Sequence, residues 1–318
     1  MALSLIVLFF LVDLGVVVDC IVSIPLSMIA ILVAVSLFQT WMASIRWRWV
    51  HPDESKQLSS WQYFRLMMVS KPFNLIMPGA FGGDLVRTAL TIKTVQSNRV
   101  NNVIAIVADR FIALLSIIFM GGIALFFISD VPDKQTFYAL FGTMVGGLLI
   151  VLLMISNARL LQFAQLVFSR LGNSGTQLLH LLETWKKALR FFRCNYASLL
   201  KALMLCLPIH GLSFLAGYLL SEILGMGISI FDISMSLSLA WIVTAIPITI
   251  SGLGVRELSL IYLLSFYNVA AESATALSIY LHIIQVIMGL IGLVLLFTTK
   301  SSLQLSETKG GFSTENTD

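Results

Sequence analysis

The stretch PFNLIMPGAFGGDLVR, residues 72–87, places helix-breaking residues and two charges inside a strongly apolar chain. Proline lacks the backbone N–H that a helix needs, and glycine costs more to order than any other residue. Four such residues lie close together here: Pro78, Gly79, Gly82 and Gly83. Asp84 and Arg87 follow directly, and Asp84 is well suited to cap a new helix beginning at Leu85. The stretch therefore predicts a broken helix with charged residues at the start of its second half.

The composition is that of an integral membrane protein. Of 318 residues, 58% are hydrophobic and 11% are charged, far from the mixture typical of a soluble domain. A helix needs roughly 20 apolar residues to cross the hydrocarbon core, where every backbone group must be paired internally. The candidate runs are 1–12, which is short and is interpreted as a tilted or incomplete first span, 22–45, 102–128, 136–156, 199–221 and 274–298. We expect an all-α polytopic membrane protein with about six full spans in a single membrane domain, residues 1–300, and a disordered cytoplasmic tail over 301–318.

The distribution of lysine and arginine predicts the orientation. Basic residues are concentrated in the segments 46–58, 93–99 and 157–201 and after residue 298, whereas the other connections are acidic. The positive-inside rule then places both termini in the cytoplasm, and the expected location is the cytoplasmic (inner) membrane of the cell. The formal net charge of +4 follows this topology, so a nucleic-acid partner is not expected.

This orientation requires two re-entrant hairpins. The apolar stretch 59–83 lies between two cytoplasmic segments, so it enters the membrane from the inside and returns. The apolar stretch 233–269 lies between two outer segments, so it enters from the outside. At its apex is AIPITISGLGVREL, residues 245–258, which contains Pro247, Gly252, Gly254, Arg256 and Glu257. Gly254 can cap a helix whose third residue is Glu257.

The two hairpins suggest an inverted repeat. Each half would consist of a span, a broken hairpin and a span, over about 22–128 and about 199–298. Many transporters have this plan, with a binding site near the midplane where discontinuous helices meet. The connector 157–198 contains an amphipathic helix rich in lysine and arginine, which we expect to lie on the inner leaflet and attract anionic lipid headgroups.

The charges at the two breaks predict an anion site. Both new helices would direct the positive ends of their dipoles, with unpaired N–H groups, into the protein, and Arg87 or Arg256 would lie nearby. Such a site suits a phosphate group. Asp84 and Glu257 would neutralise the arginines when the site is empty or carry a coupling proton. The alternative is that each arginine–carboxylate pair only holds a loop together.

Five further polar residues lie within predicted spans. Asp109 and Arg110 either line the same cavity or pair internally. His210, and His282 with Gln285, are more typical of hydrogen bonds between helices than of a proton relay. No metal-ligand or nucleotide-binding motif is present, so no cofactor and no metal site are expected.

The same stretches carry a resemblance to a known family. Residues 72–87 look like the N-x-x-x-P-G…G-D-x-x-R signature, which includes Asn74, of the lysylphosphatidylglycerol synthase transmembrane region, or flippase-like, family. VADRFIALLSI, residues 107–117, resembles the next span of the family, although here the aspartate and arginine are adjacent. IPITISGLGVRE, residues 246–257, is similar to its late P-x-x-x-x-G-x-G-x-R-E motif. The resemblance implies a membrane domain associated with lipid translocation. In related multiple peptide resistance factor proteins a soluble synthase domain follows, and since none is expected here, aminoacyl transfer is not expected either.

These observations predict a flippase-like protein, not an enzyme, that translocates or binds a phosphate-bearing lipid, either a phospholipid or a polyprenyl-phosphate-linked lipid, at a midplane site between the hairpins. The residues expected at the headgroup are Arg87, Arg256, Asp84, Glu257, Asn74, Arg110 and Asp109. The partners would be membrane lipids with anionic headgroups. The main alternative is an enzyme or accessory subunit in polyprenyl-phosphate glycolipid or aminoacyl-phospholipid synthesis. A third is a partner that recruits a lipid-modifying enzyme through residues 157–198.

Overall fold

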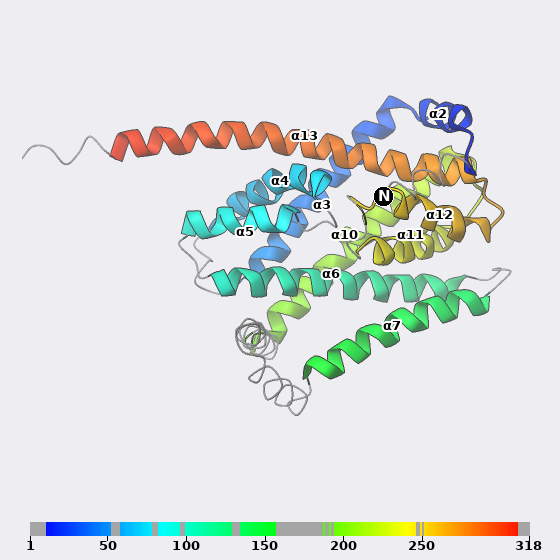
Figure 1. Cartoon of the computed structure of the whole chain (residues 1–318), viewed down its shortest axis with the longest axis horizontal. Helices are drawn as coiled ribbons and strands as arrows, with labels where there is room; N and C mark the ends of the chain where they lie inside the picture. The colour runs from blue at the N-terminus through cyan, green and yellow to red at the C-terminus, as the bar shows by residue number, and fades with distance from the viewer. Residues whose placement is uncertain are drawn as a thin grey trace, which may run out of the picture.

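The structure, a computed structural model, is helical throughout the part of the chain that it describes (Figure 1). The described residues are 11–51, 58–77, 82–95, 99–128, 134–156, 187, 191, 194–245, 249 and 251–310. The helices are α2 (Leu14–Val22), α3 (Leu26–Val50), α4 (Ser60–Ile76), α5 (Gly82–Val95), α6 (Arg99–Phe127), α7 (Lys134–Ser156), α10 (Tyr196–Ile223), α11 (Ile230–Ala245), α12 (Val255–Ser265) and α13 (Ala271–Gly310).

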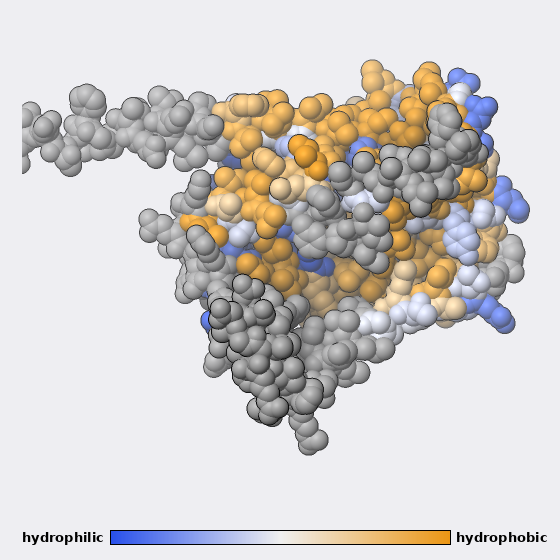
Figure 2. Space-filling model, in the orientation of Figure 1, coloured by the Kyte–Doolittle hydropathy of each residue, from blue (hydrophilic) through white to orange (hydrophobic). Residues whose placement is uncertain are grey.

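Four of these helices, α3, α6, α10 and α13, are long and apolar enough to cross a membrane. Apolar side chains cover most of the visible face of the described part of the molecule (Figure 2). The predicted all-α polytopic membrane fold is therefore confirmed. Of the two other expected spans, 136–156 lies within α7, and 1–12 lies almost entirely outside the described residues.

Both predicted broken segments form helical hairpins. Helix α4 packs against α5, and α11 packs against α12. The two pairs lie towards opposite ends of the bundle, α4 and α5 near the start of α6, and α11 and α12 near the start of α13 (Figure 1). Hairpins at opposite ends of the bundle are expected if each of them enters the membrane from a different face. Pro78, Gly79 and Pro247 lie outside the described residues.

The packing contacts have an internal symmetry that supports the predicted repeat. If α2 to α6 are matched in order with α7 and α10 to α13, the principal contacts map onto one another. The contact of α4 with α13 corresponds to that of α11 with α6, the contact of α2 with α13 corresponds to that of α7 with α6, and α3 and α10 pack against each other. This matching also includes α2 and α7, which lie before the spans from which the repeat was predicted to begin. The repeat itself stays a prediction.

Close packing between the halves depends on small residues. A Cβ atom at Gly292 of α13 would overlap the backbone carbonyl of Met68 on α4, and one at Gly289 would lie 2.6 Å from Leu75. At the corresponding contact, a Cβ atom at Gly121 of α6 would lie 2.9 Å from Ser238 on α11. Lipid provides no hydrophobic force that drives two helices together, so their association depends on van der Waals packing. Small residues such as glycine allow the close approach that this packing needs.

The start of the second helix differs between the hairpins. Gly254 is the N-cap of α12 with Glu257 as its third residue, as predicted. Helix α5 begins at Gly82, so Asp84 lies within its first turn and does not cap a helix at Leu85, contrary to the prediction. The physical reason is that Asn74 accepts a hydrogen bond from the Gly83 amide at 2.7 Å and thereby satisfies a donor in the first turn of a helix that begins three residues before Leu85.

The structure describes only part of two predicted segments, the tail from residue 301 and the connector 157–198. Helix α13 continues to Gly310, so the first ten residues of the tail expected to be disordered from 301 are helical. They include good helix formers such as leucine, glutamine, glutamate and lysine. Most of the connector 157–198, and residues 311–318, lie outside the described residues.

Candidate functional site

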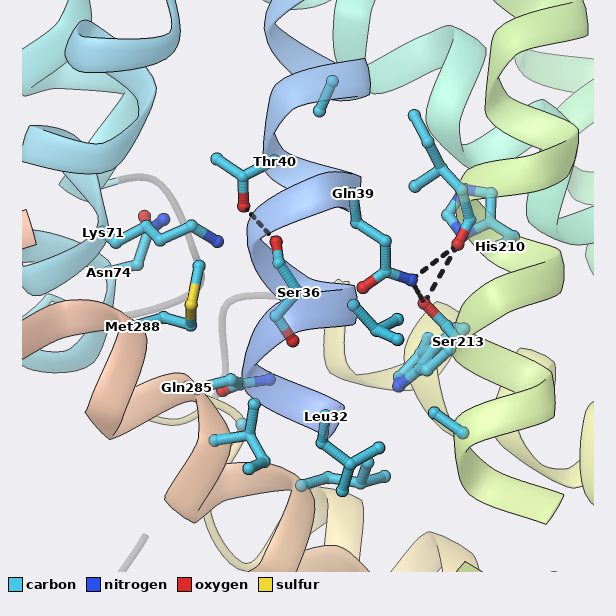
Figure 3. A pocket seen from close by; sticks show the side chains of 18 of the residues that line it. Leu32, Ser36, Gln39, Thr40, Lys71, Asn74, His210, Ser213, Gln285 and Met288 are labelled. Carbon is cyan, nitrogen blue, oxygen red and sulfur yellow. Dashed lines mark hydrogen bonds between the residues drawn. The ribbon is translucent and has the colours of Figure 1, made fainter. Parts of the chain in front are cut away.

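A cavity of about 510 Å³ lies between the two hairpins and the helices that flank them. This volume is within the usual range for small-molecule sites. Residues from α3, α4, α6, α10, α11, α12 and α13, and from the turn before α12, line it. The polar side chains among them are Ser36, Gln39, Thr40, Lys71, Asn74, His210, Ser213, Thr244, Ser251, Arg256 and Gln285. Figure 3 shows Lys71 and Asn74 on one side of the cavity and Gln39, His210 and Ser213 on the other.

The charged residues in this described lining are both cationic. Lys71 and Arg256 line the cavity, and no aspartate or glutamate is among the lining residues. The amine of Lys71 points across towards α3, where Ser36 and Thr40 lie (Figure 3). Within the described part of the chain Lys71 has no carboxylate within ion-pairing distance. The cavity therefore has a surplus of positive charge.

Lys71 was not among the residues predicted for the site. It immediately precedes the stretch 72–87, and it lies in an apolar segment that was itself predicted to enter the membrane. An ionisable residue within the membrane is expensive to bury and commonly functional. This signal was present in the sequence and would have identified the residue.

Arg256 is held at the edge of the cavity by a compact polar network. Its Nε atom donates to Ser278 Oγ at 2.9 Å, and Ser278 Oγ donates to Glu257 Oε1 at 2.7 Å. The Glu257 Oε2 atom accepts the Gly254 amide at 2.6 Å, and Arg256 Nη2 lies 3.4 Å from Glu257 Oε1. Arg256 Nη1 has no hydrogen bond to another described residue. Glu257 and Ser278 thus hold the Nε and Nη2 atoms, and within the described part of the chain Nη1 stays available to donate.

The backbone before Arg256 has an unusual conformation. Ser251, Gly252 and Gly254 have φ values of 54°, 76° and 82°. This left-handed region is costly for a serine and ordinary for glycine. A Cβ atom at Gly252 would also lie 3.2 Å from Thr244 on α11. The turn therefore explains the glycines of the second motif and places Ser251, Gly252 and Arg256 together at the cavity.

The charges of the first hairpin form a second, larger network away from the cavity. Arg87 Nη2 lies 2.9 Å from Asp84 Oδ1 and 3.1 Å from Asp109 Oδ2. Asp109 Oδ1 also accepts from Arg46 Nε at 2.8 Å, and Arg110 pairs with the other oxygen of Asp84. Three arginines and two aspartates give a formal charge of +1. This network connects α5 to α3 and α6.

Arg87 does not line the cavity, although Arg256 does. Its side chain is buried, its Nη1 donates to the sulfur of Met67 at 3.1 Å, and its guanidinium lies 4.6 Å from the ring centroid of Trp47. Met67 lines the cavity, so Arg87 contacts a lining residue without lining the cavity itself. Of the two alternatives for the arginine–carboxylate pairs, the geometry around Arg87 is that of an internal support. Its predicted direct contact with a headgroup stays a prediction.

The remaining residues predicted for the headgroup site also divide into those that line the cavity and those that form internal pairs. Asn74 lines the cavity and also holds the start of α5, and Gly83 allows this because a Cβ atom there would lie 2.6 Å from Asn74 Oδ1. Asp109 and Arg110 pair internally with different partners and do not line the cavity. The amides of Gly83 and Gly254, at the two helix starts, are paired with protein acceptors. The donors available to an anion are therefore side chains, not the unpaired amides that the sequence suggested at these two positions.

His210 and Gln285 line the cavity, whereas His282 is not among the lining residues. The His210 ring packs on Trp241, with centroids 6.2 Å apart, and its Nε2 atom has no hydrogen bond to another described residue. Neither histidine has a hydrogen-bonded chain to a carboxylate across the described cavity lining, as a relay would need.

An all-helical bundle with membrane-crossing helices, two broken hairpins and a polar cavity between them defines a polytopic membrane protein with an internal binding site. The family model "Lysylphosphatidylglycerol synthase TM region" matches residues 1–292, and the chain belongs to this family. The family relates it to membrane proteins of lipid synthesis or flipping. No curated protein and no solved structure matches the chain.

Proposed function

We propose that the protein binds the phosphate-bearing headgroup of a membrane lipid in the cavity between its two hairpins and moves it across the membrane without changing it chemically. The headgroup would lie against Lys71 and Arg256, while the acyl or prenyl tails stay in the lipid. The single observation that carries the proposal is the surplus of positive charge in a cavity whose described lining contains no carboxylate.

The energetics favour an anionic occupant. A cation buried away from water is costly unless an opposite charge compensates it. Arg256 has Glu257 beside it, but Lys71 has no such partner among the described residues. A phosphate group would supply the missing charge, since lysine offers three donors and the free edge of Arg256 offers more.

The fold offers a route for movement as well as for binding. In transporters built from inverted repeats, one half rocks or gates against the other around a fixed central site. Here both halves contribute to the cavity, α4 from the first and Arg256 from the second. The network of Arg46, Asp109, Arg87 and Asp84 would keep the first hairpin rigid during such a movement. The proposal includes residence in the cytoplasmic membrane with both termini inside the cell.

The test is transport of a lipid in vesicles that contain the purified protein. A fluorescent phospholipid with a labelled acyl chain should become accessible to a membrane-impermeant quencher faster than in protein-free vesicles. Lys71→Gln and Arg256→Gln should each reduce the rate roughly ten- to hundred-fold, because a hydrogen bond to a charged group contributes about 1.5–3 kcal/mol. Arg256→Lys should recover only part of the rate, since lysine lacks the planar pair of donors.

The matched control is Lys201→Gln, which removes an exposed lysine on α10. It should transport at the wild-type rate. Wild-type rates in both cavity variants would contradict the proposal. Chemical conversion of the lipid in place of transport would favour the alternative of an enzyme or a subunit of one.

A further inference from the structure

We infer that the surface where α3 ends and α4 begins binds an anionic phospholipid of the adjoining leaflet, outside the cavity. The phosphate would lie on Arg48, and an acyl chain would lie along Trp61 and Trp41. The proposed function gives these residues no role, and the inference does not depend on it. It comes from two arginines without a carboxylate partner and from the aromatic side chains beside them.

Arg48 differs from most of the described arginines in its partners. Those with a carboxylate within ion-pairing distance are Arg46, Arg87, Arg110 and Arg256. Arg48 instead donates from Nη1 to Ser60 Oγ at 2.7 Å, which ties the end of α3 to the start of α4. In the described part of the chain its Nε and Nη2 atoms have no hydrogen bond. The side chain is half-buried, so these donors are available to a ligand at the surface.

The length of α3 places Arg48 among the lipid headgroups. A helix of 25 residues rises about 38 Å at roughly 1.5 Å per residue. This exceeds the hydrocarbon core of about 30 Å, and Arg48 lies in the last turn. The next residue, Trp49, is exposed, as is typical of the interface between membrane and water. In the predicted orientation this is the cytoplasmic leaflet, whose anionic lipids attract basic residues.

An aromatic surface continues from Arg48 towards the membrane interior. Trp61 directly follows Ser60 and is 56% exposed. Its ring stacks on Phe64 with centroids 5.3 Å apart, and the Trp41 ring lies 6.4 and 5.5 Å from these two rings. Trp41 precedes Arg48 by seven residues, two turns of α3, and so lies on the same face of that helix. A lipid with its phosphate on Arg48 would therefore have an apolar wall for its chain.

A second cation lies on the same surface. Arg65 is four residues after Trp61, so the two side chains are neighbours on α4. Arg65 has neither an ion pair nor a hydrogen bond to the described residues. Two cations favour a lipid with net negative charge over a zwitterionic one, whose ammonium group they would repel. Each basic residue near an anionic surface contributes about fivefold in affinity.

The site is open to the membrane, so its lipid should exchange with the bilayer and be removed by detergent. The experiment therefore uses the full chain in phosphatidylcholine vesicles that contain a minor fraction of a lipid brominated on its acyl chain. Bromine quenches the fluorescence of a tryptophan that it contacts. Brominated phosphatidylglycerol should quench the protein more strongly than the same fraction of brominated phosphatidylcholine, with a preference of at least tenfold in apparent affinity.

The variants assign this preference to the two arginines. Arg48→Gln should lower it about tenfold, because the hydrogen bonds to the phosphate are also lost. Arg65→Gln should lower it about fivefold, and Lys201→Gln should leave it unchanged. Equal quenching of the wild-type protein by the two brominated lipids would overturn the inference.

Ser60→Ala separates lipid binding from a structural role of Arg48. It removes the same bond between α3 and α4 but keeps the guanidinium. The preference for phosphatidylglycerol should therefore persist in Ser60→Ala. A loss as large as that in Arg48→Gln would show that the arginine only ties the helices together, and the inference would be wrong.

The cavity needs its own control, because Trp241 lines it and a lipid held there would also quench fluorescence. In the double variant Lys71→Gln, Arg256→Gln the preference should persist. If this double variant loses the preference and Arg48→Gln keeps it, the lipid lies in the cavity. The inference is then wrong and the proposed function is supported. A protein that shows the preference at Arg48 but moves no lipid would contradict only the proposed function.

Discussion

Replacing Asp109 by asparagine removes a carboxylate that lies between two buried arginines, Arg46 and Arg87, while it keeps the size of the side chain. The Asp109 oxygens lie 2.8 Å from Arg46 Nε and 3.1 Å from Arg87 Nη2. At an effective dielectric constant of about 20, these contacts correspond to about 6 and about 5 kcal/mol of Coulomb energy. Much of this offsets the cost of removing the three groups from water. Taking one partner from a buried ion pair costs about 3–5 kcal/mol in practice.

We therefore expect Asp109→Asn to lower the apparent melting temperature of the detergent-purified protein by roughly 10 °C, since each kcal/mol corresponds to about 2–4 °C in proteins of 150–250 residues. The measurement is the fraction of monodisperse protein left after heating. Glu222→Gln, at an exposed glutamate on α10, is the matched control and should melt like the wild type. Adding Arg46→Met to Asp109→Asn should recover part of the loss, because one uncompensated cation is then removed. A melting temperature within 2 °C of the wild type for Asp109→Asn would refute the account of this network.

Two further predictions concern packing and orientation. Gly292→Ala should destabilise the protein by about 1–3 kcal/mol, because the new methyl group would overlap the Met68 carbonyl. The control is Gly142→Ala, whose new methyl group would meet nothing within 4 Å and which should be neutral or stabilising in the same melting assay. The same loss of stability in both variants would show that the contact of α13 with α4 is not tight. In a variant with its native cysteines replaced by serine, a cysteine introduced at Glu222 should react with an impermeant reagent in intact cells, and one at Lys201 only after permeabilisation. The reverse pattern would contradict the predicted orientation.

The hairpins were predictable because their signals are local. Proline and glycine break a helix wherever they occur, and lysine and arginine report the side of the membrane. The cap formed by Gly254 and Glu257 depends on residues three positions apart, so it could be found in the sequence. The start of α5 could not, because it depends on Asn74, which lies nine positions before Gly83.

The partners of Asp109 depend on the packed fold. Adjacent residues on a helix do not face each other, so Asp109 and Arg110 could not form one unit. Asp109 pairs instead with Arg46 and Arg87, which lie 63 and 22 positions away. Such distant pairs follow from the packing of α3, α5 and α6, which the apolar pattern alone does not specify.

The arginines of the two motifs, Arg87 and Arg256, also differ in their position along the helix, which the similarity of the motifs does not reveal. Arg256 is the second residue of α12, next to the turn at the cavity, whereas Arg87 is the sixth residue of α5 and lies in its second turn. The similar order of proline, glycine and arginine suggested equivalent roles. The difference in position along the helix directs Arg256 to the cavity and Arg87 to the carboxylates of Asp84 and Asp109.

The most direct test of the central claim is native mass spectrometry of the protein purified in mild detergent from its own membrane. The wild-type protein and Lys201→Gln should retain a lipid whose fragments contain phosphate. The double variant Lys71→Gln, Arg256→Gln should lose that lipid while it remains folded and monodisperse. Equal retention of the same lipid by the double variant, or a wild-type protein that holds no phosphate-bearing lipid, would contradict a headgroup site in the cavity between the hairpins.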